Sequence, residues 1–247
     1  MNTSSQRNPI ALHDFLASWS GCDGGHLKAD VWICGIEHGG ACEPNTPLQT
    51  EREPGAWDET FKTSHPEFFT WQYHQKVAKL MVAIERLRRP RGSRLEENYR
   101  AYMEERLYVR GGDTFKLNLF PFSSPSTSSS EWEQAYKSVL GMTRDSYAEL
   151  CRQVRFPFFA KERQKYAPKV VLATGKTYRD DFVRAFGFSN TSVEEFHIGN
   201  RECRRYRDQE STLVVTPFFG GRYGMNSDGL LERLAEEIAG ILMRATD

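Results

Sequence analysis

The sequence lacks a net charge and a long hydrophobic run. Its 247 residues include 33 Lys and Arg against 33 Asp and Glu, so the overall charge gives no electrostatic sign of nucleic-acid binding. No apolar stretch approaches the roughly 18 residues that a membrane span requires. The polar start MNTSSQRNP also lacks the apolar core of a signal peptide. We therefore expect a cytoplasmic protein with no membrane partner.

Cysteine and metal-binding motifs are also scarce. The five cysteines form no CxxC pair, which is typical of reduced thiols in a cytoplasmic protein. Glu37, His38 and Cys42 are too few and lack the helical HxxxH spacing of a metal site. A Cys-His hydrolase is disfavoured because Cys34 lies in a predicted strand and Cys42 in a loop. We expect no metal and no cofactor.

One nucleotide-binding motif is incomplete. Gly175-Lys176-Thr177 resembles the end of a P-loop, but that loop requires a glycine five positions earlier, where this chain has Val170. The sequence also has no nucleophile elbow or cofactor fingerprint, which disfavours a small-molecule hydrolase or transferase.

Four short apolar runs define the expected fold. They are VWICG from Val31, FKLNLF from Phe115, KVVLATG from Lys169 and TLVVT from Thr212, and each ends in a polar or glycine-rich stretch. Helical patterns separate them, so we predict an α/β fold: three α/β/α layers around a central, mainly parallel, four-stranded sheet. One domain spans residues 1–247, with a disordered start at 1–10 and a basic, charged helical insertion at 86–113.

The periodicity of apolar residues predicts the remaining elements. A hairpin or short strands are expected over residues 194–206, with a turn at Gly199-Asn200, and a long loop over 41–62. Helices are predicted over residues 11–19, 65–87, 95–107, 131–140, 144–155, 180–186 and 230–243.

The carboxyl ends of parallel strands meet at one edge of a sheet, so the four polar endings should share a pocket. Gly35 and the glycines after it permit a close backbone approach to a ligand, and Glu37 would face the crevice. The alternative for Glu37 is a solvated turn. Asn118 lies between two leucines, and a buried amide must be hydrogen-bonded, either internally or to a ligand. An amide offers a donor and an acceptor side by side, the arrangement that reads a base edge.

These motifs, in this order, resemble the uracil-DNA glycosylase superfamily. The counterparts are GIEHG from Gly35, KLNLFPF from Lys116, VVLATG from Val170 and VVTPFFGGRYG from Val214, and FFTW from Phe68 resembles an aromatic pair of that family. The similarity covers most of residues 28–243, and order and spacing carry it more than identity does. It implies a DNA glycosylase that removes a damaged or modified base by water attack at the sugar. The alternative is a noncatalytic protein of the same fold that binds a nucleobase or nucleic acid.

The resemblance assigns roles to individual residues. Glu37 would position water, Asn118 would read the base edge, and an aromatic side chain would stack on the base. Three departures stand out: Glu37 replaces an Asp or Asn, His38 replaces a Pro, and Thr216 replaces the His that stabilises the departing base, which weakens the case for efficient uracil excision. The catalytic candidates are Glu37, His38 and Thr216. The base-binding candidates are Gly35, Ile36, Phe68, Phe69, Trp71 and Asn118.

Arginine clusters supply the local positive charge for a nucleic-acid partner. They lie at residues 86–94 and 201–207, and they would either contact phosphates or be ordinary solvated arginines. The expected partner is DNA, single- or double-stranded, or a nucleobase-containing small molecule. The nucleic-acid-binding candidates are Arg88, Arg89, Arg91, Pro217, Gly221, Arg222 and Tyr223.

Overall fold

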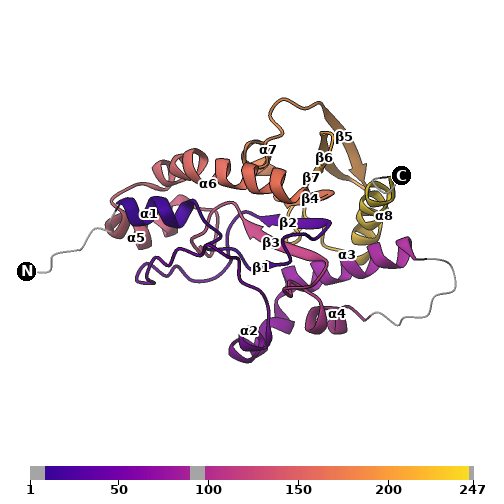
Figure 1. The fold of residues 1–247 in the computed structure, drawn as a ribbon, viewed down its shortest axis with the longest axis horizontal. Coiled ribbons are helices and arrows are strands. Elements are labelled where there is room, and N and C mark those ends of the chain that lie inside the picture. The colour runs from indigo at the N-terminus through magenta and orange to yellow at the C-terminus, as the bar shows by residue number, and fades with distance from the viewer. Residues whose placement is uncertain (1–8, 90–97, 245–247) are drawn as a thin grey trace, which may run out of the picture.

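The computed structural model describes residues 9–89 and 98–244 (Figure 1). Within these ranges the chain has eight α-helices, two short 3-10 helices and seven strands. The α-helices are α1 (Pro9–Leu16), α2 (Glu59–Ser64), α3 (Gln72–Arg88), α4 (Tyr99–Glu105), α5 (Ser129–Leu140), α6 (Arg144–Tyr166), α7 (Arg179–Ala185) and α8 (Asp228–Arg244). The 3-10 helices are η1 (Pro66–Thr70) and η2 (Lys176–Tyr178). The strands are β1 (Gly24–Gly25), β2 (Val31–Gly35), β3 (Thr114–Asn118), β4 (Val170–Thr174), β5 (Val193–Ile198), β6 (Arg201–Arg207) and β7 (Thr212–Thr216).

The α/β class is confirmed, but the sheet is larger than predicted and is mixed. Its strand order is β1-β3-β2-β4-β7-β6-β5. The four predicted strands are adjacent and parallel, whereas the pairs β1–β3, β5–β6 and β6–β7 are antiparallel. The prediction of a four-stranded, mainly parallel sheet is therefore wrong. The hairpin predicted over residues 194–206 is present as β5 and β6. The antiparallel pairing of β6 with β7 was not predicted, because no local sequence pattern encodes it.

Side-chain alternation along the central strands builds two separate cores. Val31 and Ile33 pack in a cluster with α3 and α8, while Trp32 and Cys34 pack in another with α1, α5 and α6. Successive side chains of a strand point to opposite faces, so these clusters cover the two faces of the sheet. Figure 1 shows α6 along one face and α3 along the other.

Several helix boundaries differ from the predicted ones. The predicted helix 65–87 breaks at Trp71, which is extended (φ −73°, ψ 102°) between η1 and α3. The helix that starts at Arg144 continues to Tyr166 with Pro157 inside it. The predicted loop 41–62 ends earlier, where Asp58 caps α2 by accepting from the backbone N–H of Phe61.

The segment predicted as a charged insertion contributes to the core. Of the predicted helix 95–107, the structure describes residues 98 onward, where α4 is helical. Tyr102, Met103, Leu107 and Tyr108 are buried against α3. Residues 1–8 and 90–97, where a disordered start and part of the basic cluster were predicted, lie outside the described ranges.

Candidate functional site

One large cavity lies at the carboxyl ends of the four parallel strands. Its volume is about 1310 Å³, and its lining includes the residues that follow β2, β3, β4 and β7. Along the chain, β2 is followed by β3 on one side and then by β4 on the other. The carboxyl ends of β2 and β4 therefore form a topological switch point, where open α/β sheets bind ligands.

Two glycines at this switch point leave room for neighbouring side chains. A Cβ atom on Gly35 would lie 2.6 Å from Asn118 Oδ1 and 3.2 Å from Lys116 Nζ. Gly175 has a φ of +134°, and its Cβ would lie 2.7 Å from Ile36 Cδ1. A side chain at Gly35 would require Asn118 to move, and one at Gly175 would require Ile36 to move and would also strain the backbone at its positive φ.

The floor of the cavity is a buried polar cluster of Asp23, Lys116 and Asn118. Lys116 and Asn118 are two residues apart on β3, so their side chains leave the same face of the sheet. Lys116 Nζ donates to Asn118 Oδ1 (2.6 Å) and to the Leu117 carbonyl (2.9 Å), and it lies 3.4 Å from Asp23 Oδ2. Asn118 Nδ2 donates weakly to the Gly21 carbonyl (3.4 Å) and Asp23 Oδ2 (3.5 Å). All three side chains line the cavity.

Two titratable groups of this floor hold fixed protonation states. Burial alone would raise the pKa of Asp23, but nearby groups, of which Lys116 contributes most, together lower it to about 2. Burial lowers the pKa of His74, which also lines the cavity, to about 3. At neutral pH Asp23 is therefore an anion and His74 is uncharged.

A completely buried arginine fixes the backbone under this cluster. Arg155 on α6 donates to the Asn118 carbonyl (3.3 and 3.2 Å) and the Ser18 carbonyl (3.3 Å). Its guanidinium lies 4.5 Å from the centroid of the Phe159 ring. The arginine therefore joins the end of β3 to the segment after α1 and fixes the backbone of Asn118.

Glu37, the predicted water-positioning residue, lines the cavity and is paired with Arg144. Arg144 Nη2 donates to both carboxylate oxygens, at 3.1 and 2.8 Å. The two side chains are only 6% and 10% exposed. Burial raises the pKa of Glu37 to about 7, although Arg144 opposes this rise. A carboxyl that titrates near neutral pH is able to both accept and return a proton there.

The other two catalytic candidates differ in position. His38 lines the cavity, and its Nε2 lies 3.0 Å from the Gly21 carbonyl oxygen. Thr216 is fully buried and does not line the cavity; its hydroxyl donates to the Pro217 carbonyl at 3.0 Å. The structure therefore brings Glu37, His38 and Asn118 to one cavity and leaves Thr216 beneath its wall.

Of the predicted stacking residues, only Trp71 lines the cavity. Phe68 is buried in the core beside Trp57, and Phe69 packs on Phe68 with a centroid distance of 3.9 Å. The break before α3 turns these two rings inward. The structure instead places Tyr73 at the cavity, stacked on Phe218 with a centroid distance of 5.6 Å and an interplanar angle of 17°.

The glycine-rich loop after β7 forms part of the rim. Pro217, Gly221, Arg222 and Tyr223 line the cavity, and the Tyr223 side chain is 74% exposed. Arg201 of β6 anchors this loop by donating to the carbonyls of Arg222 and Gly224, each at 3.0 Å. The loop residues predicted to contact nucleic acid therefore line the same cavity as the predicted base-binding residues Trp71 and Asn118.

The first arginine cluster lies at the other end of the sheet. Tyr73 at the start of α3 is at the cavity, whereas Arg88 ends that helix 15 residues later, about 22 Å along its axis. Arg88 approaches Asp30, just before β2, at 4.0 Å, and Arg89 pairs with Glu85. Arg91 lies outside the described residues.

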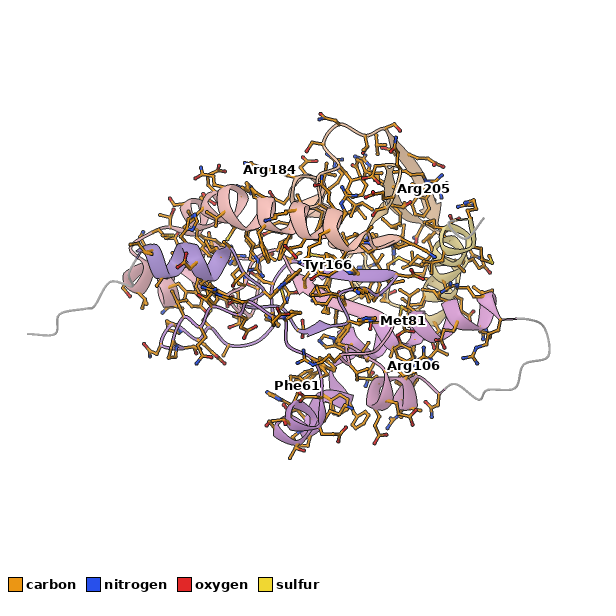
Figure 2. The ribbon with its side chains drawn as sticks, viewed as in Figure 1. Phe61, Met81, Arg106, Tyr166, Arg184 and Arg205 are labelled. Carbon is orange, nitrogen blue, oxygen red and sulfur yellow. The ribbon has the colours of Figure 1, made fainter. Side chains whose placement is uncertain are left out.

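The second arginine cluster is engaged in ion pairs on the hairpin. Arg204 pairs with Glu195 (2.6 Å) and Arg205 with Glu194 and Glu237; Figure 2 shows Arg205 on the hairpin beside α8. Arg204 and Arg205 are therefore neutralised locally, whereas Arg201 donates to backbone carbonyls and Arg207 is exposed.

The sequence reading missed Asp23, Tyr73, Lys116 and Arg144. A usable signal existed for Lys116, because a lysine two residues before Asn118 in an apolar strand must share its face. No local signal marks Asp23 or Arg144, since their partners are 93 and 107 positions away in the sequence.

Within the described ranges, no group of three or more His, Cys, Asp or Glu side chains is placed to hold a metal ion. None of the helices described is long and apolar enough to cross a membrane. No protein-family model matches the chain, and no curated protein is significantly similar to it.

Proposed function

We propose that the cavity binds a nucleobase and that the protein is a uracil-DNA-glycosylase-like enzyme, which hydrolyses the bond between a damaged or modified base and its sugar. The observation that supports this most is that Glu37 and Asn118, from the ends of neighbouring strands, line one cavity at the switch point of the sheet. A volume of about 1310 Å³ exceeds that of a typical small-molecule pocket. It therefore accommodates a nucleotide together with part of its chain.

The chemistry assigns Glu37 the role of general base. In its ionised form the carboxylate accepts a proton from water as the water oxygen bonds to the anomeric sugar carbon. The bond from that carbon to the base nitrogen breaks, and its electron pair leaves with the base. Asn118 Nδ2, whose two contacts with the protein are long, would donate to the departing base and stabilise its negative charge.

The rim supports a nucleic-acid chain as the partner. Arg222 and Lys176 line the cavity, and Lys176 is 55% exposed, with Glu202 4.0 Å away. Together with the exposed Tyr223 ring they combine cations with an aromatic surface, as single-strand binding sites do. The positive charge available to phosphates is therefore at the rim rather than at Arg88 and Arg89.

A noncatalytic nucleobase-binding protein is the second candidate. Two observations favour it: Arg144 donates to both oxygens of Glu37, and the Thr216 hydroxyl is directed to the backbone instead of the cavity. Both reduce the capacity for catalysis without affecting recognition by Asn118.

A single-turnover excision assay and a binding assay on the same oligonucleotides distinguish these candidates. The substrates carry uracil, hypoxanthine, xanthine or an oxidised or hydroxymethylated pyrimidine. We expect excision of at least one base, with Asn118→Ala weakening base recognition by about 1–3 kcal/mol while binding to an undamaged strand persists. Asn190→Ala, in an exposed turn after α7, is the matched control. Binding without excision of any base would support the noncatalytic candidate, and absence of both would refute the proposal.

A further inference from the structure

Three aromatic rings form a stack that starts in the core and ends at the cavity. Trp57 lies on Phe61 with a centroid distance of 4.8 Å and an interplanar angle of 13°, and Phe61 lies on His65 at 4.4 Å and 22°. Trp57 is 1% exposed, whereas Phe61 and His65 line the cavity. Figure 2 shows Phe61 on α2, on the side of the molecule away from α6. His65 is therefore the cavity end of this stack.

The backbone holds the His65 ring in place. Its Nδ1 lies 3.0 Å from the Phe61 carbonyl oxygen, which also accepts from the His65 backbone N–H at 2.9 Å. Trp71 meets the ring edge-on, with an interplanar angle of 65° and a centroid distance of 6.0 Å. Phe61 covers one face of the imidazole, and within the described residues no ring stacks on the other face. A fixed, half-buried ring of this kind presents a surface for one more planar group.

A row of neighbouring rings connects His65 to the polar floor of the cavity. Trp71 lies next to His74, with a centroid distance of 5.7 Å, and His74 lies next to Tyr73 at 5.2 Å. These rings all line the cavity. Lys116 of the floor lies 5.5 Å from the centroid of the Tyr73 ring. Because three ring-to-ring steps separate His65 from Tyr73, His65 faces a different part of the cavity from a base bound at the floor.

A single strand of nucleic acid is the ligand that fits both parts of the cavity. Its bases are planar groups joined in succession, and proteins bind unpaired bases by stacking them on aromatic side chains, histidine included. In a duplex, neighbouring base pairs cover both faces of each base, so stacking on a ring requires an unpaired base. The volume of about 1310 Å³ exceeds what one base needs, and the rim cations Arg222 and Lys176 line the same cavity.

We propose that the outer face of His65 is a second base subsite, which stacks on another unpaired base of the strand whose target base is bound at the polar floor. The inference rests on the proposed function and deepens it by naming the partner: a single strand that is held by at least two of its bases. Every base has a π face, so His65 contributes affinity for the strand and does not select a particular base.

Fluorescence anisotropy with short single strands tests the subsite. The intact probe is a labelled heptanucleotide of thymidines around a central 2′-fluoro-deoxyuridine, whose glycosidic bond resists hydrolysis. The other probes each carry one abasic residue, at each of the remaining positions in turn. We expect one abasic position to weaken binding by the wild-type protein at least about fivefold, which is the lower end of what one stacked base contributes.

Variants of His65 then show whether this ring is the partner of that base. His65→Ala should weaken the intact probe as much, but it should change the affinity for the critical abasic probe by less than about twofold, because ring and base interact only with each other. His65→Phe keeps a ring and should bind the intact probe within about twofold of wild type. His197→Ala is the matched control, an exposed histidine on β5 that does not line the cavity, and it should bind as wild type does.

A measurement on the wild-type protein covers the case in which His65→Ala does not fold. The ring current of a base stacked on the imidazole should move the ring-proton resonances of His65 upfield when the intact probe is added. The probe that is abasic at the critical position should leave these resonances where they are in the free protein. Equal shifts with both probes would overturn the subsite.

The outcomes separate the subsite from the proposed function. If the strands bind but no abasic position matters, or if His65→Ala weakens intact and abasic probes equally, the subsite is overturned and the proposed function is unaffected. If no strand binds at millimolar concentration, the subsite is also overturned, and the excision assay decides the proposed function separately. Excision in that assay together with a silent His65→Ala would keep the function and remove the subsite.

Discussion

Two buried ion pairs lie at the cavity, and the pKa values of their carboxyl groups are shifted in opposite directions. Asp23–Lys116 is the longer pair, at 3.4 Å, and Glu37–Arg144 the shorter, at 2.8 Å. The pKa of Asp23 is nevertheless lowered to about 2, while that of Glu37 is raised to about 7. In both cases burial raises the pKa. For Asp23 the opposing contributions, of which that of Lys116 is the largest, together outweigh burial.

The distance within an ion pair therefore does not fix the protonation state of its carboxyl group. The balance between burial and all nearby positive charge does. The Asp23 carboxyl beside Lys116 is therefore ionised at neutral pH, whereas the Glu37 carboxyl beside Arg144 gains or loses a proton there. The first suits a device that fixes Asn118, and the second suits acid–base chemistry.

Breaking the Asp23–Lys116 pair should have the largest effect, which is on the stability of the fold. Lys116→Met leaves the Asp23 carboxylate buried without its partner, which should lower the free energy of unfolding by about 3–5 kcal/mol at pH 7. Adding Asp23→Asn should recover part of this loss, because it removes the stranded charge. Urea unfolding of the two single variants and the double variant gives the coupling. A loss below about 1 kcal/mol for Lys116→Met would mean that the pair is not effectively buried.

Removing the proton-exchanging carboxyl should mainly affect the reaction. Glu37→Gln keeps the shape and a hydrogen-bonding group but cannot act as a base, so the single-turnover excision rate should fall by about 10²-fold. Glu67→Gln, an exposed glutamate on η1, should not change the rate. An unchanged rate in Glu37→Gln would remove Glu37 from the mechanism whatever the fold.

The two pairs should also differ in how stability depends on pH. Because the folded-state pKa of Glu37 is raised, its contribution is fully present below about pH 4.5 and is lost as pH rises through 7. We expect a decline on the order of 2 kcal/mol over this interval, absent in Glu37→Gln. Asp23 has a lowered pKa, so its contribution is present above about pH 3.8 and is lost as pH falls through 2. Chemical unfolding at a series of pH values checks both signs; equal pH dependence in wild type and Glu37→Gln would contradict the first.

The smallest expected effect distinguishes the two ends of the sheet. If the cavity rim meets phosphates, Arg222→Ala should reduce the slope of log affinity against log salt by about one. Arg88→Ala with Arg89→Ala should leave the slope unchanged, since both residues lie at the opposite end of α3. The reverse result would relocate the nucleic-acid surface to the amino ends of the strands.

The strands and their polar endings were predictable because period-two burial and glycine punctuation are local signals. Gly35, Glu37 and Asn118 were found in this way, and the structure places them at one cavity. What failed depended on distant contacts: the pairing of the hairpin onto β7, and the carboxylate of Asp23 reaching Lys116. Thr216 was wrongly expected to face the cavity. A sequence pattern indicates where a strand ends but not which way the last side chain points.

The hydrogen bonds of Arg155 to the carbonyls of Ser18 and Asn118 bear on how the functional unit should be delimited. A fragment that began at Val31 would keep all four parallel strands and every site residue foreseen from the sequence. It would lose the Asp23 anion, the Gly21 carbonyl that Asn118 and His38 contact, and one of the anchors of the buried guanidinium. The segment before the first long strand is therefore part of the proposed binding site, and a graft of this site onto another scaffold has to carry it.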